Sequence, residues 1–229
     1  MASDGCERSG GRRGLQAIAE DSSELVSLIA LDCNPHCPTN WSPHQAISED
    51  WSDEQLSFGD FKARGQITLQ PGATGELMEK VEETLMALGS MLASRYVAPF
   101  REGVQGWVAK LSAVSDVLEV WMQVQGMWIY LEAVFTSGDI AKQLPQESKR
   151  FLGIDKSWEK IMVKALETRN VVQYIYGNEG LQELLPHLLE QLELCQKALS
   201  GYLDQKRAAF PRFYFVSDPS LLEILSQVC

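Results

Sequence analysis

Four potential metal ligands lie close together near the N-terminus, in the segment CNPHCPTNWSPH. They are Cys33, His36, Cys37 and His44. Zinc binds thiolates and imidazoles, but structural zinc sites have closed, regular ligand spacings, and C-x-x-x-C with a histidine inside it matches none of them. We therefore interpret these cysteines as free thiols and predict no metal site.

Phosphate-binding loops are the second kind of chemistry to consider. The sequence contains neither G-x-x-x-x-G-K-[ST] nor G-x-G-x-x-G. Its nearest glycine cluster, at residues 72–75, lacks the lysine that would reach a phosphate. We predict that this chain holds no nucleotide and no other cofactor.

Nucleophilic catalysis has no support either. His187 follows Pro186 in a helical segment and has no serine or cysteine nucleophile beside it in a recognisable motif. Cys195 falls on the apolar stripe of the same segment and should behave as a small buried hydrophobe. The chain is predicted not to be an enzyme.

A row of lysines is the remaining polar pattern. Lys156, Lys160 and Lys164 recur every four residues and therefore share one face of a predicted helix. Such a face could dock an acidic partner, and a simple solvated helix surface explains it equally well.

Composition limits the classes of protein that could carry these residues. The chain has 229 residues and a net charge of −11, so it should repel nucleic acid. No apolar run approaches eighteen residues, which excludes a membrane-spanning helix. The N-terminus lacks the apolar core of a secretory signal. The five cysteines are odd in number and irregularly spaced, so we expect a cytosolic protein with free thiols.

Residues 1–57 differ from the rest of the chain. They hold ten acidic residues and three arginines, a net charge of −7, and they show no sustained period. We predict a disordered acidic leader, with a short helix possible at residues 22–31, because little of this segment could bury enough apolar surface to offset its ordering entropy. Order should begin at Phe58.

Helical periodicity dominates the remainder. Apolar residues repeat every three or four positions in four long segments, which predicts an all-α, elongated bundle of long antiparallel helices. The first helix should be capped by Thr74 and the third by Asp155. The expected helices span about 74–96, 99–135, 155–177 and 179–203, with a shorter piece at 145–151 and an extended stretch at 67–69.

The second helix is the longest, and we expect its apolar seam to provide stiffness along the bundle. Large rings at helical spacing are normally core residues rather than a cofactor site. The seam includes Trp107, Leu111, Leu118, Trp121 and Trp128.

After the fourth helix the sequence FPRFYF is too aromatic and too short for another helix. We predict an extended, partly buried connector where successive bundles join and could bend. Its candidate hinge residues are Phe210, Pro211, Phe213 and Phe215.

A final helix begins near Ser217 and carries an apolar face made by Leu221, Leu222, Ile224 and Leu225. The chain ends at Cys229 with no C-cap, so the sequence reads as the front part of something longer. We expect the unpartnered face to promote self-association.

Three segments resemble one family closely. They are VWMQVQGMWIYLEAVFTSGDIAKQLPQESKRFLGIDKSWEKIM, LLPHLLEQLELCQKALSGYLDQKRAAFPRFYFVSDPSLLEIL and FKARGQITLQ. Together they make residues 58–229 similar to the linker region of dynein heavy chains, most of all axonemal, outer-arm-type chains. Residues 1–57 show no comparable resemblance.

The resemblance implies a curved, all-helical rod that lies across a ring of AAA+ modules and swings as ATP is hydrolysed. The ATP-binding ring and the microtubule-binding stalk would lie outside this sequence. The implied partners are the AAA+ ring and, through the full-length assembly, intermediate and light chains and microtubules. The implied location is the cytoskeleton, in the axoneme of a cilium or flagellum. The alternative is a stand-alone helical interaction module derived from a dynein linker.

Overall fold

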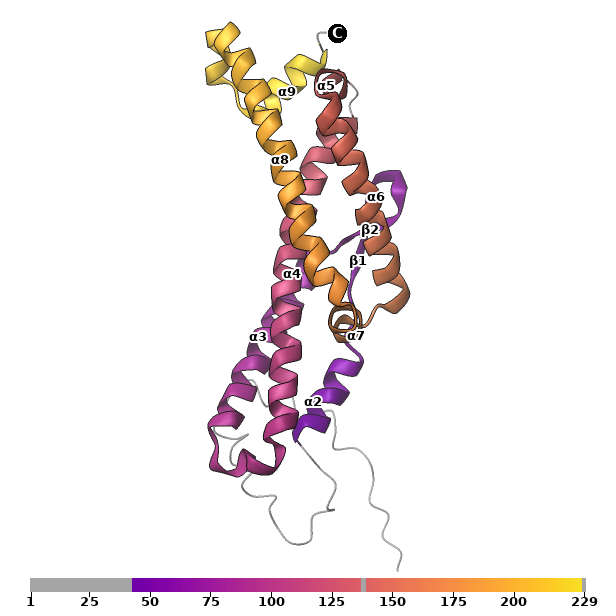
Figure 1. Cartoon of the computed structure of the whole chain (residues 1–229), viewed down its shortest axis with the longest axis vertical. Helices are drawn as coiled ribbons and strands as arrows, with labels where there is room; N and C mark the ends of the chain where they lie inside the picture. Colours follow the sequence, from indigo (N-terminus) through magenta and orange to yellow (C-terminus); the bar gives the residue numbers. More distant parts are fainter. Residues whose placement is uncertain (1–42, 137–138, 228–229) are drawn as a thin grey trace, which may run out of the picture.

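The computed structural model describes residues 43–136 and 139–227, which form an elongated bundle of long helices with one small hairpin (Figure 1). This architecture confirms the predicted all-α class. The helices are α2 (Pro43–Ser52), α3 (Pro71–Ala93), α4 (Arg101–Thr136), α5 (Asp139–Gln143), α6 (Pro145–Thr168), α7 (Val171–Tyr176), α8 (Glu179–Ala209) and α9 (Asp218–Gln227). The strands are β1 (Phe58–Asp60) and β2 (Gln66–Leu69), and the 3-10 turns are η1 (Lys62–Arg64), η2 (Arg95–Phe100) and η3 (Pro211–Phe215).

Helix α4 is the axis of the bundle. Its 36 residues correspond to a rod about 54 Å long. It contacts α2, α3, α5, α6, α7, α8 and β2 along its length. The predicted seam is therefore covered by other helices: Leu111, Leu118, Trp121 and Trp128 are fully buried, whereas Trp107 is only half-buried.

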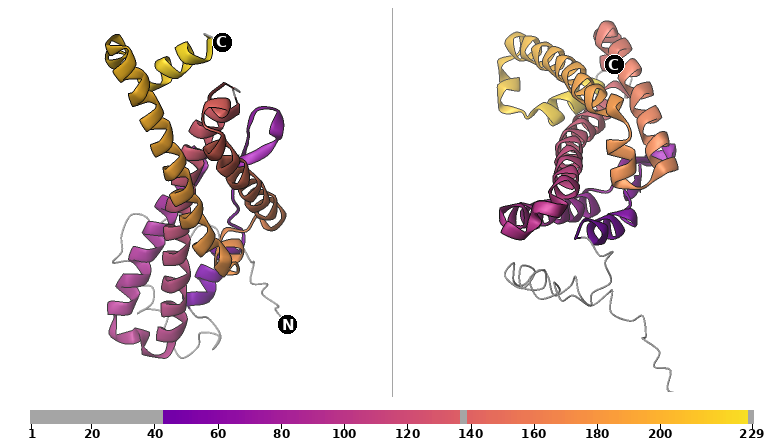
Figure 2. Two further views of the ribbon diagram at one scale, coloured as in Figure 1. Left: turned by 45° about the horizontal axis from the view of Figure 1, so that its top comes forward. Right: turned by 60° about the horizontal axis from the view of Figure 1, so that its bottom comes forward.

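Helix α3 runs antiparallel to the first half of α4 (Figures 1 and 2). It begins at Pro71, where the missing N–H costs nothing, and its N-cap is Gln70. Thr74, predicted as the cap, instead lies buried inside the helix with its hydroxyl bonded to the Gln70 carbonyl at 2.9 Å. Pro99, expected to open the next helix, lies inside the 3-10 turn η2.

Helix α6 corrects two expectations. It runs unbroken from Pro145 to Thr168, so Asp155 lies in mid-helix and does not cap a new one. It then stops nine residues before the predicted end at Gly177, because Arg169 adopts a positive φ of 54° and Asn170 caps α7 with its side chain.

Helix α8 follows the predicted stripe, with Leu188, Leu192, Cys195, Leu199 and Leu203 buried. Pro186 is accommodated within it, near its N-terminal end. Leu184 on the same helix is exposed, whereas the next residue, Leu185, is buried.

Residues 43–57 correct the predicted boundary of the leader. Pro43–Ser52 form α2, which packs on α4 and α7. Trp51 and Leu56 are buried in the same core as the long helices. Ile47 is buried as well. The prediction missed these three apolar residues because the segment is acidic and shows no sustained period. The predicted leader upstream of residue 43, including the helix at 22–31 and Cys33, His36 and Cys37, lies outside the described residues.

The aromatic connector also differs from its prediction. Residues 211–215 form the short 3-10 turn η3 at the end of α8, not an extended strand across the bundle. Most of its rings face outward: Tyr214 and Phe215 are 61% and 93% exposed, as is the preceding Phe210 at 48%, whereas Phe213 is partly buried against the core. This run of aromatic residues forms a tight turn in which Phe213 alone packs against the core.

The last helix, α9, packs back on α8. Leu221 and Leu222 are buried there, and only Ile224 of the predicted face is clearly exposed. The expectation that Leu221 and Leu222 lie on an unpartnered face is therefore wrong, because the chain covers them itself, and self-association stays a prediction.

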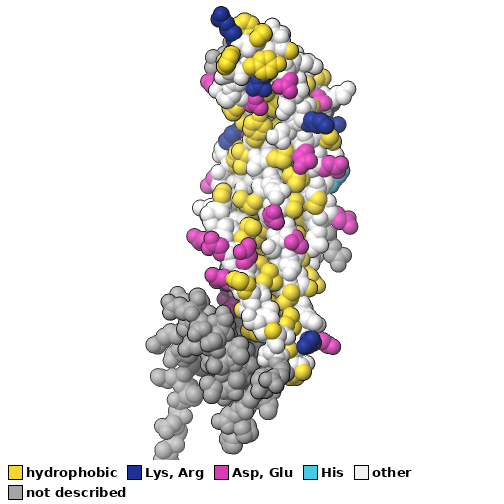
Figure 3. All heavy atoms as spheres, turned by 90° about the vertical axis from the view of Figure 1, so that its left-hand side faces the viewer, with side chains coloured by type: hydrophobic (Ala, Val, Ile, Leu, Met, Phe, Trp, Pro, Cys, Tyr) yellow, Lys and Arg dark blue, Asp and Glu magenta, His cyan; other side chains and the backbone are white. Residues whose placement is uncertain are grey.

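None of the described helices is long and apolar enough to cross a membrane. On the face drawn in Figure 3, acidic side chains are scattered along the middle of the rod, and hydrophobic side chains gather toward its upper end.

Candidate functional site: a polar clamp between the hairpin and the long helices

The hairpin β1–η1–β2 places a charged loop against α4 and α6. Its strands are antiparallel, with Phe58 opposite Leu69, and a register shift at Gly59/Asp60. Gly65, with φ of 80°, provides the left-handed turn into β2 that other residues rarely adopt. The tip of the loop therefore presents Lys62 and Arg64 to the two helices.

Arg64 joins the hairpin to both helices. Its guanidinium donates two hydrogen bonds of 2.9 Å to the carboxylate of Asp155 on α6 and lies over the ring of Trp128 on α4. The indole N–H of Trp128 donates to the same carboxylate at 3.0 Å. These hydrogen bonds to Asp155 raise the pKa of Arg64, so its guanidinium stays protonated.

Lys62 makes a second ionic contact, with Glu132 on α4. Glu132 is only 4% exposed, and a buried carboxylate is costly unless it is paired. The aromatic ring of Phe61 lies 5.0 Å from that of Trp128, so apolar and ionic contacts fasten the same loop.

Beneath the loop, buried hydrogen bonds fasten the strand itself. The Gln125 side chain accepts a bond from the Leu69 N–H at 2.7 Å and donates one to the Leu69 carbonyl at 2.9 Å. The indole N–H of Trp158 donates to the Ile67 carbonyl at 3.0 Å. Side chains of α4 and α6 thus take the place of a third strand beside β2.

A second joint lies at the break between α6 and α7. The Asn170 side chain accepts from the Gln173 N–H at 2.8 Å and donates to the carbonyls of Trp51, Ser52 and Glu54. Two backbone bonds between residues 54–56 and 169–171 complete it. Those tertiary bonds replace the helical ones, which explains why the predicted continuous helix breaks here.

Pairs of aromatic rings pack in the core beside the hairpin and beside α7. Trp128 and Trp158 lie 5.6 Å apart and nearly parallel, and Trp121 lies 5.8 Å from Tyr174. Such pairs add specificity of orientation to the area they bury. We define the polar clamp as Lys62, Arg64, Gln125, Glu132 and Asp155, and Asn170 as the second joint.

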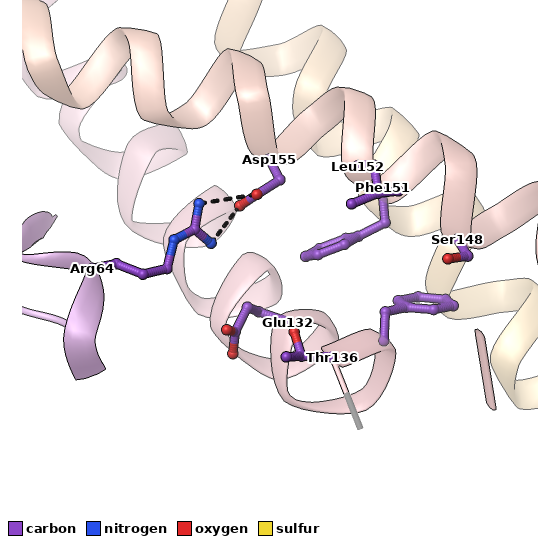
Figure 4. A pocket seen from close by; sticks show the side chains of 8 residues that line it. Arg64, Glu132, Thr136, Ser148, Phe151, Leu152 and Asp155 are labelled. Carbon is purple, nitrogen blue, oxygen red and sulfur yellow. Dashed lines mark hydrogen bonds and ion pairs between the residues drawn. The ribbon is translucent and has the colours of Figure 1, made fainter. Parts of the chain in front are cut away.

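Beside the clamp is a hollow of about 210 Å³ (Figure 4). Phe135, Phe151 and Leu152 form its apolar wall, and Thr136 and Ser148 line it as well. Its carboxylates, Glu132 and Asp155, are held by Lys62 and Arg64. In the described part of the chain, no group of three His, Cys, Asp or Glu side chains could hold a metal ion. The arrangement is suited to holding elements together.

The structure separates the predicted functional residues into three places. The seam residues Leu111, Leu118, Trp121 and Trp128 lie in the core, and Trp128 alone belongs to the clamp's contacts. Phe210, Pro211, Phe213 and Phe215 lie at the far end of α8, and Lys156, Lys160 and Lys164 are exposed on α6. The stiffening and hinge roles predicted for them stay predictions.

The clamp residues were missed by reasoning from the sequence, although a signal was present. Gln125 and Glu132 occupy core positions of the α4 stripe, between Trp121, Trp128 and Phe135. A polar residue in such a position needs a buried partner. Its partners, however, lie 56 and 70 residues away in the sequence.

Known proteins identify the class to which this clamped rod belongs. A sequence model described as "Dynein heavy chain, N-terminal region 2" matches residues 43–229. The chain therefore belongs to the dynein heavy chain family, and the matched part is this N-terminal region. The match begins at residue 43, where α2 begins, which agrees with the corrected boundary.

The individual relatives are axonemal and flagellar. The chain is 56% identical over 181 residues to dynein axonemal heavy chain 8 of Homo sapiens, covering 79% of this chain and 4% of the relative. It is 57% identical over 183 residues to dynein axonemal heavy chain 5 of Rattus norvegicus (80% and 5%), and 57% identical over 178 residues to the dynein gamma chain, flagellar outer arm, of Chlamydomonas reinhardtii (78% and 4%). The chain thus spans about one twentieth of these relatives. The resemblance noted in the sequence is confirmed, and a stand-alone module is not favoured.

One titratable group in the core gives a pH-dependent prediction. Burial raises the pKa of Tyr174 to about 12, and its hydroxyl donates to the Ile161 carbonyl at 2.9 Å. Above pH 10 the unfolded chain loses this proton and the folded chain keeps it, so stability is intact below pH 10 and falls as pH rises toward 12. The slope from this group should approach about 1.4 kcal/mol per pH unit. Urea unfolding across this range measures it.

The matched variant is Tyr174→Phe. It should be less stable at neutral pH, because it loses the bond to Ile161, yet it should show a shallower decline above pH 10. Tyr130, whose pKa is also raised by burial, remains in the variant and accounts for a residual slope. An unchanged slope in Tyr174→Phe would contradict the assignment.

Proposed function

We propose that this region acts as the linker, the mechanical lever, of an axonemal dynein heavy chain. The observation that supports the proposal is the way α4 is held. Six helices and the hairpin contact it along some 54 Å, and ionic and buried polar bonds fasten the hairpin to α4 and α6 together. A lever must transmit force without its parts sliding, and helices fixed to one another at several points meet that need.

Within this proposal the chemistry belongs to other parts of the heavy chain. ATP would bind and be hydrolysed in the AAA+ ring, with which the linker would work. Intermediate chains, light chains and microtubules would be reached through the full assembly. The place of action would be the axoneme of a cilium or flagellum, in keeping with the axonemal and flagellar relatives.

A chimaera tests the proposal. Residues 43–229 would replace the matching segment of a flagellar outer arm heavy chain, and microtubule gliding velocity and ATPase rate would both be measured. The chimaera should glide. The Gln125→Leu version should keep the ATPase rate of the ring while the gliding velocity falls, because a less rigid linker transmits less displacement for each ATP hydrolysed. Equal gliding by both versions, with the clamp shown to be broken, would contradict a lever role.

The isolated chain should not bind ATP. Its sequence has no phosphate-binding loop. Isothermal titration calorimetry with Mg-ATP should give no heat above dilution. Micromolar affinity that disappears on unfolding the chain would overturn this expectation.

We further propose that the exposed aromatic turn contacts another segment of the same heavy chain. We define the aromatic cap as Phe210, Phe213, Tyr214 and Phe215. Phe210 and Phe213 pack edge to face, and Arg207 braces the turn by binding Asp218 and the Val216 carbonyl. The turn therefore presents its rings in a fixed arrangement.

The size of the aromatic cap favours a contact within one molecule. Its exposed rings offer on the order of 400 Å², about half of what one partner contributes to a stable complex. Between two segments of one chain the free-energy cost of association is smaller than between separate molecules, because the effective concentration is high. The proposal retains the joining role predicted for FPRFYF, although the segment forms a 3-10 turn and not the predicted extended connector.

The aromatic cap gives a contrast between two phenylalanines. Phe215→Ser should leave the free energy of unfolding of this chain within about 0.5 kcal/mol, because the ring is almost fully exposed. Phe135→Ser, at a buried ring stacked on Phe151, should cost several kcal/mol. Denaturant unfolding measures both, and a loss above about 2 kcal/mol for Phe215→Ser would show that the ring is packed.

A further inference from the structure

The lysines of α6 form neither an ion pair nor a ring contact, unlike most other lysines in the described residues. In the described residues, Lys62 and Lys80 form ion pairs, Lys110 and Lys206 lie over aromatic rings, and Lys142 has an interaction of its own. That leaves five lysines without such a contact. Four of these are on α6: Lys149, Lys156, Lys160 and Lys164; the fifth is Lys197 on α8.

The four α6 lysines share one face of the helix. Their spacings of seven, four and four residues keep them within an arc of about 80°. The stripe is about 22 Å long, since fifteen residues separate its ends. All four are exposed. We define Lys149, Lys156, Lys160 and Lys164 as the lysine stripe.

The lysine stripe stands out because the chain as a whole is acidic. The net charge is −11, and acidic side chains are scattered along the face drawn in Figure 3. Unpaired like charges in a row repel one another and contribute nothing to folding. An anionic partner would relieve that repulsion, and the lysines could turn to it without giving up a contact inside the molecule.

We propose that the lysine stripe is a docking surface for an acidic peptide segment of another protein. A stripe of about 22 Å matches about seven residues of extended peptide. A short, flexible acidic segment can follow one helix face and avoid the acidic parts of the rod. A longer rigid polyanion, such as duplex nucleic acid, would meet those parts and be repelled. The proposal does not depend on the lever function.

The test uses the full chain and a fluorescein-labelled peptide of eight glutamates, with binding followed by fluorescence anisotropy at low ionic strength. The triple variant Lys156→Gln, Lys160→Gln, Lys164→Gln should bind about tenfold or more weakly. Its control is Arg101→Gln, Lys197→Gln, Arg212→Gln, which removes the same charge from exposed positions elsewhere and should change affinity less than about threefold. Circular dichroism should show both variants folded, because every substituted side chain is exposed.

A gain of binding strengthens the test. Glu159 and Glu167 are exposed acidic residues on α6 beside the lysine stripe, so Glu159→Gln with Glu167→Gln should tighten binding. Carbodiimide cross-linking should join the peptide to the stripe lysines in preference to Lys197. If the peptide does not bind at low ionic strength, or if the control triple variant weakens binding as much as the stripe variant, the proposal is wrong.

Discussion

Trp128→Ala is expected to lower the free energy of unfolding by about 3–5 kcal/mol, the range typical of a buried tryptophan truncated to alanine. Trp128 is fully buried at the point where α4, α6 and the hairpin meet. It stacks on Trp158, supports Arg64 and donates a hydrogen bond to Asp155. The variant therefore leaves a cavity and loosens the polar clamp at once. Equilibrium denaturation with guanidinium chloride, followed by circular dichroism, measures the loss.

Trp107→Ala is the matched control, because the same ring is removed from the same helix. Trp107 is half-buried and packs at the edge of the core, with Lys110 over its ring at 4.8 Å. Its removal should cost clearly less than that of Trp128, since less area leaves the core and solvent can fill the space. Equal losses of unfolding free energy in the two variants would mean that the contacts of Trp128 at this junction add no stability beyond those of a half-buried tryptophan.

Gln125→Leu is expected to destabilise the chain by about 2–4 kcal/mol, although leucine suits a helix and a core better than glutamine does. The reason is that the variant leaves the Leu69 N–H and carbonyl without their partner in a buried place, and each unsatisfied group costs about 1–3 kcal/mol. Thermal and urea unfolding give the loss. Hydrogen exchange should locate it, with the Leu69 amide exchanging faster than amides in the middle of α8.

Gln123→Leu is the control for this second substitution. Gln123 lies two residues away on the exposed side of α4, where its side chain reaches only Glu119 at 3.4 Å. Its replacement should change stability by no more than about 0.5 kcal/mol. If Gln125→Leu were as mild as Gln123→Leu, the paired hydrogen bonds to β2 would not be what holds the hairpin on α4.

The long helices and their buried faces could be predicted from the sequence because a helix is encoded locally. Leu111, Leu118, Trp121 and Trp128 lie three or seven residues apart, which places them on one side of a helix, and all four are buried as expected. The same holds for Leu188 through Leu203 on α8. Each such repeat needs only its own neighbours in the sequence to place one apolar stripe on one side of a helix.

Helix ends and polar contacts were harder, because distant residues decide them. Asp155 looked like a cap, but it stays inside a continuous helix where it binds Arg64, 91 residues earlier. The α6 stripe looked continuous, but Asn170 interrupts it by bonding to the carbonyls of residues 51–54. Local propensity could not favour either outcome without knowledge of those partners.

For the candidate site, the sequence by itself determined which residues form the seam of the rod and that Lys156, Lys160 and Lys164 share a face, since both follow from helical spacing. That Lys149 lies on the same face was decided by the unbroken course of α6. Only the tertiary structure decided that Gln125 and Glu132 on that seam bind the hairpin, and that Phe210, Tyr214 and Phe215 of the FPRFYF segment are exposed. The physical reason is the same in each case. A buried polar group is stable only with a partner, and an aromatic ring is buried only if another element covers it. Both conditions depend on how segments far apart in the chain come together.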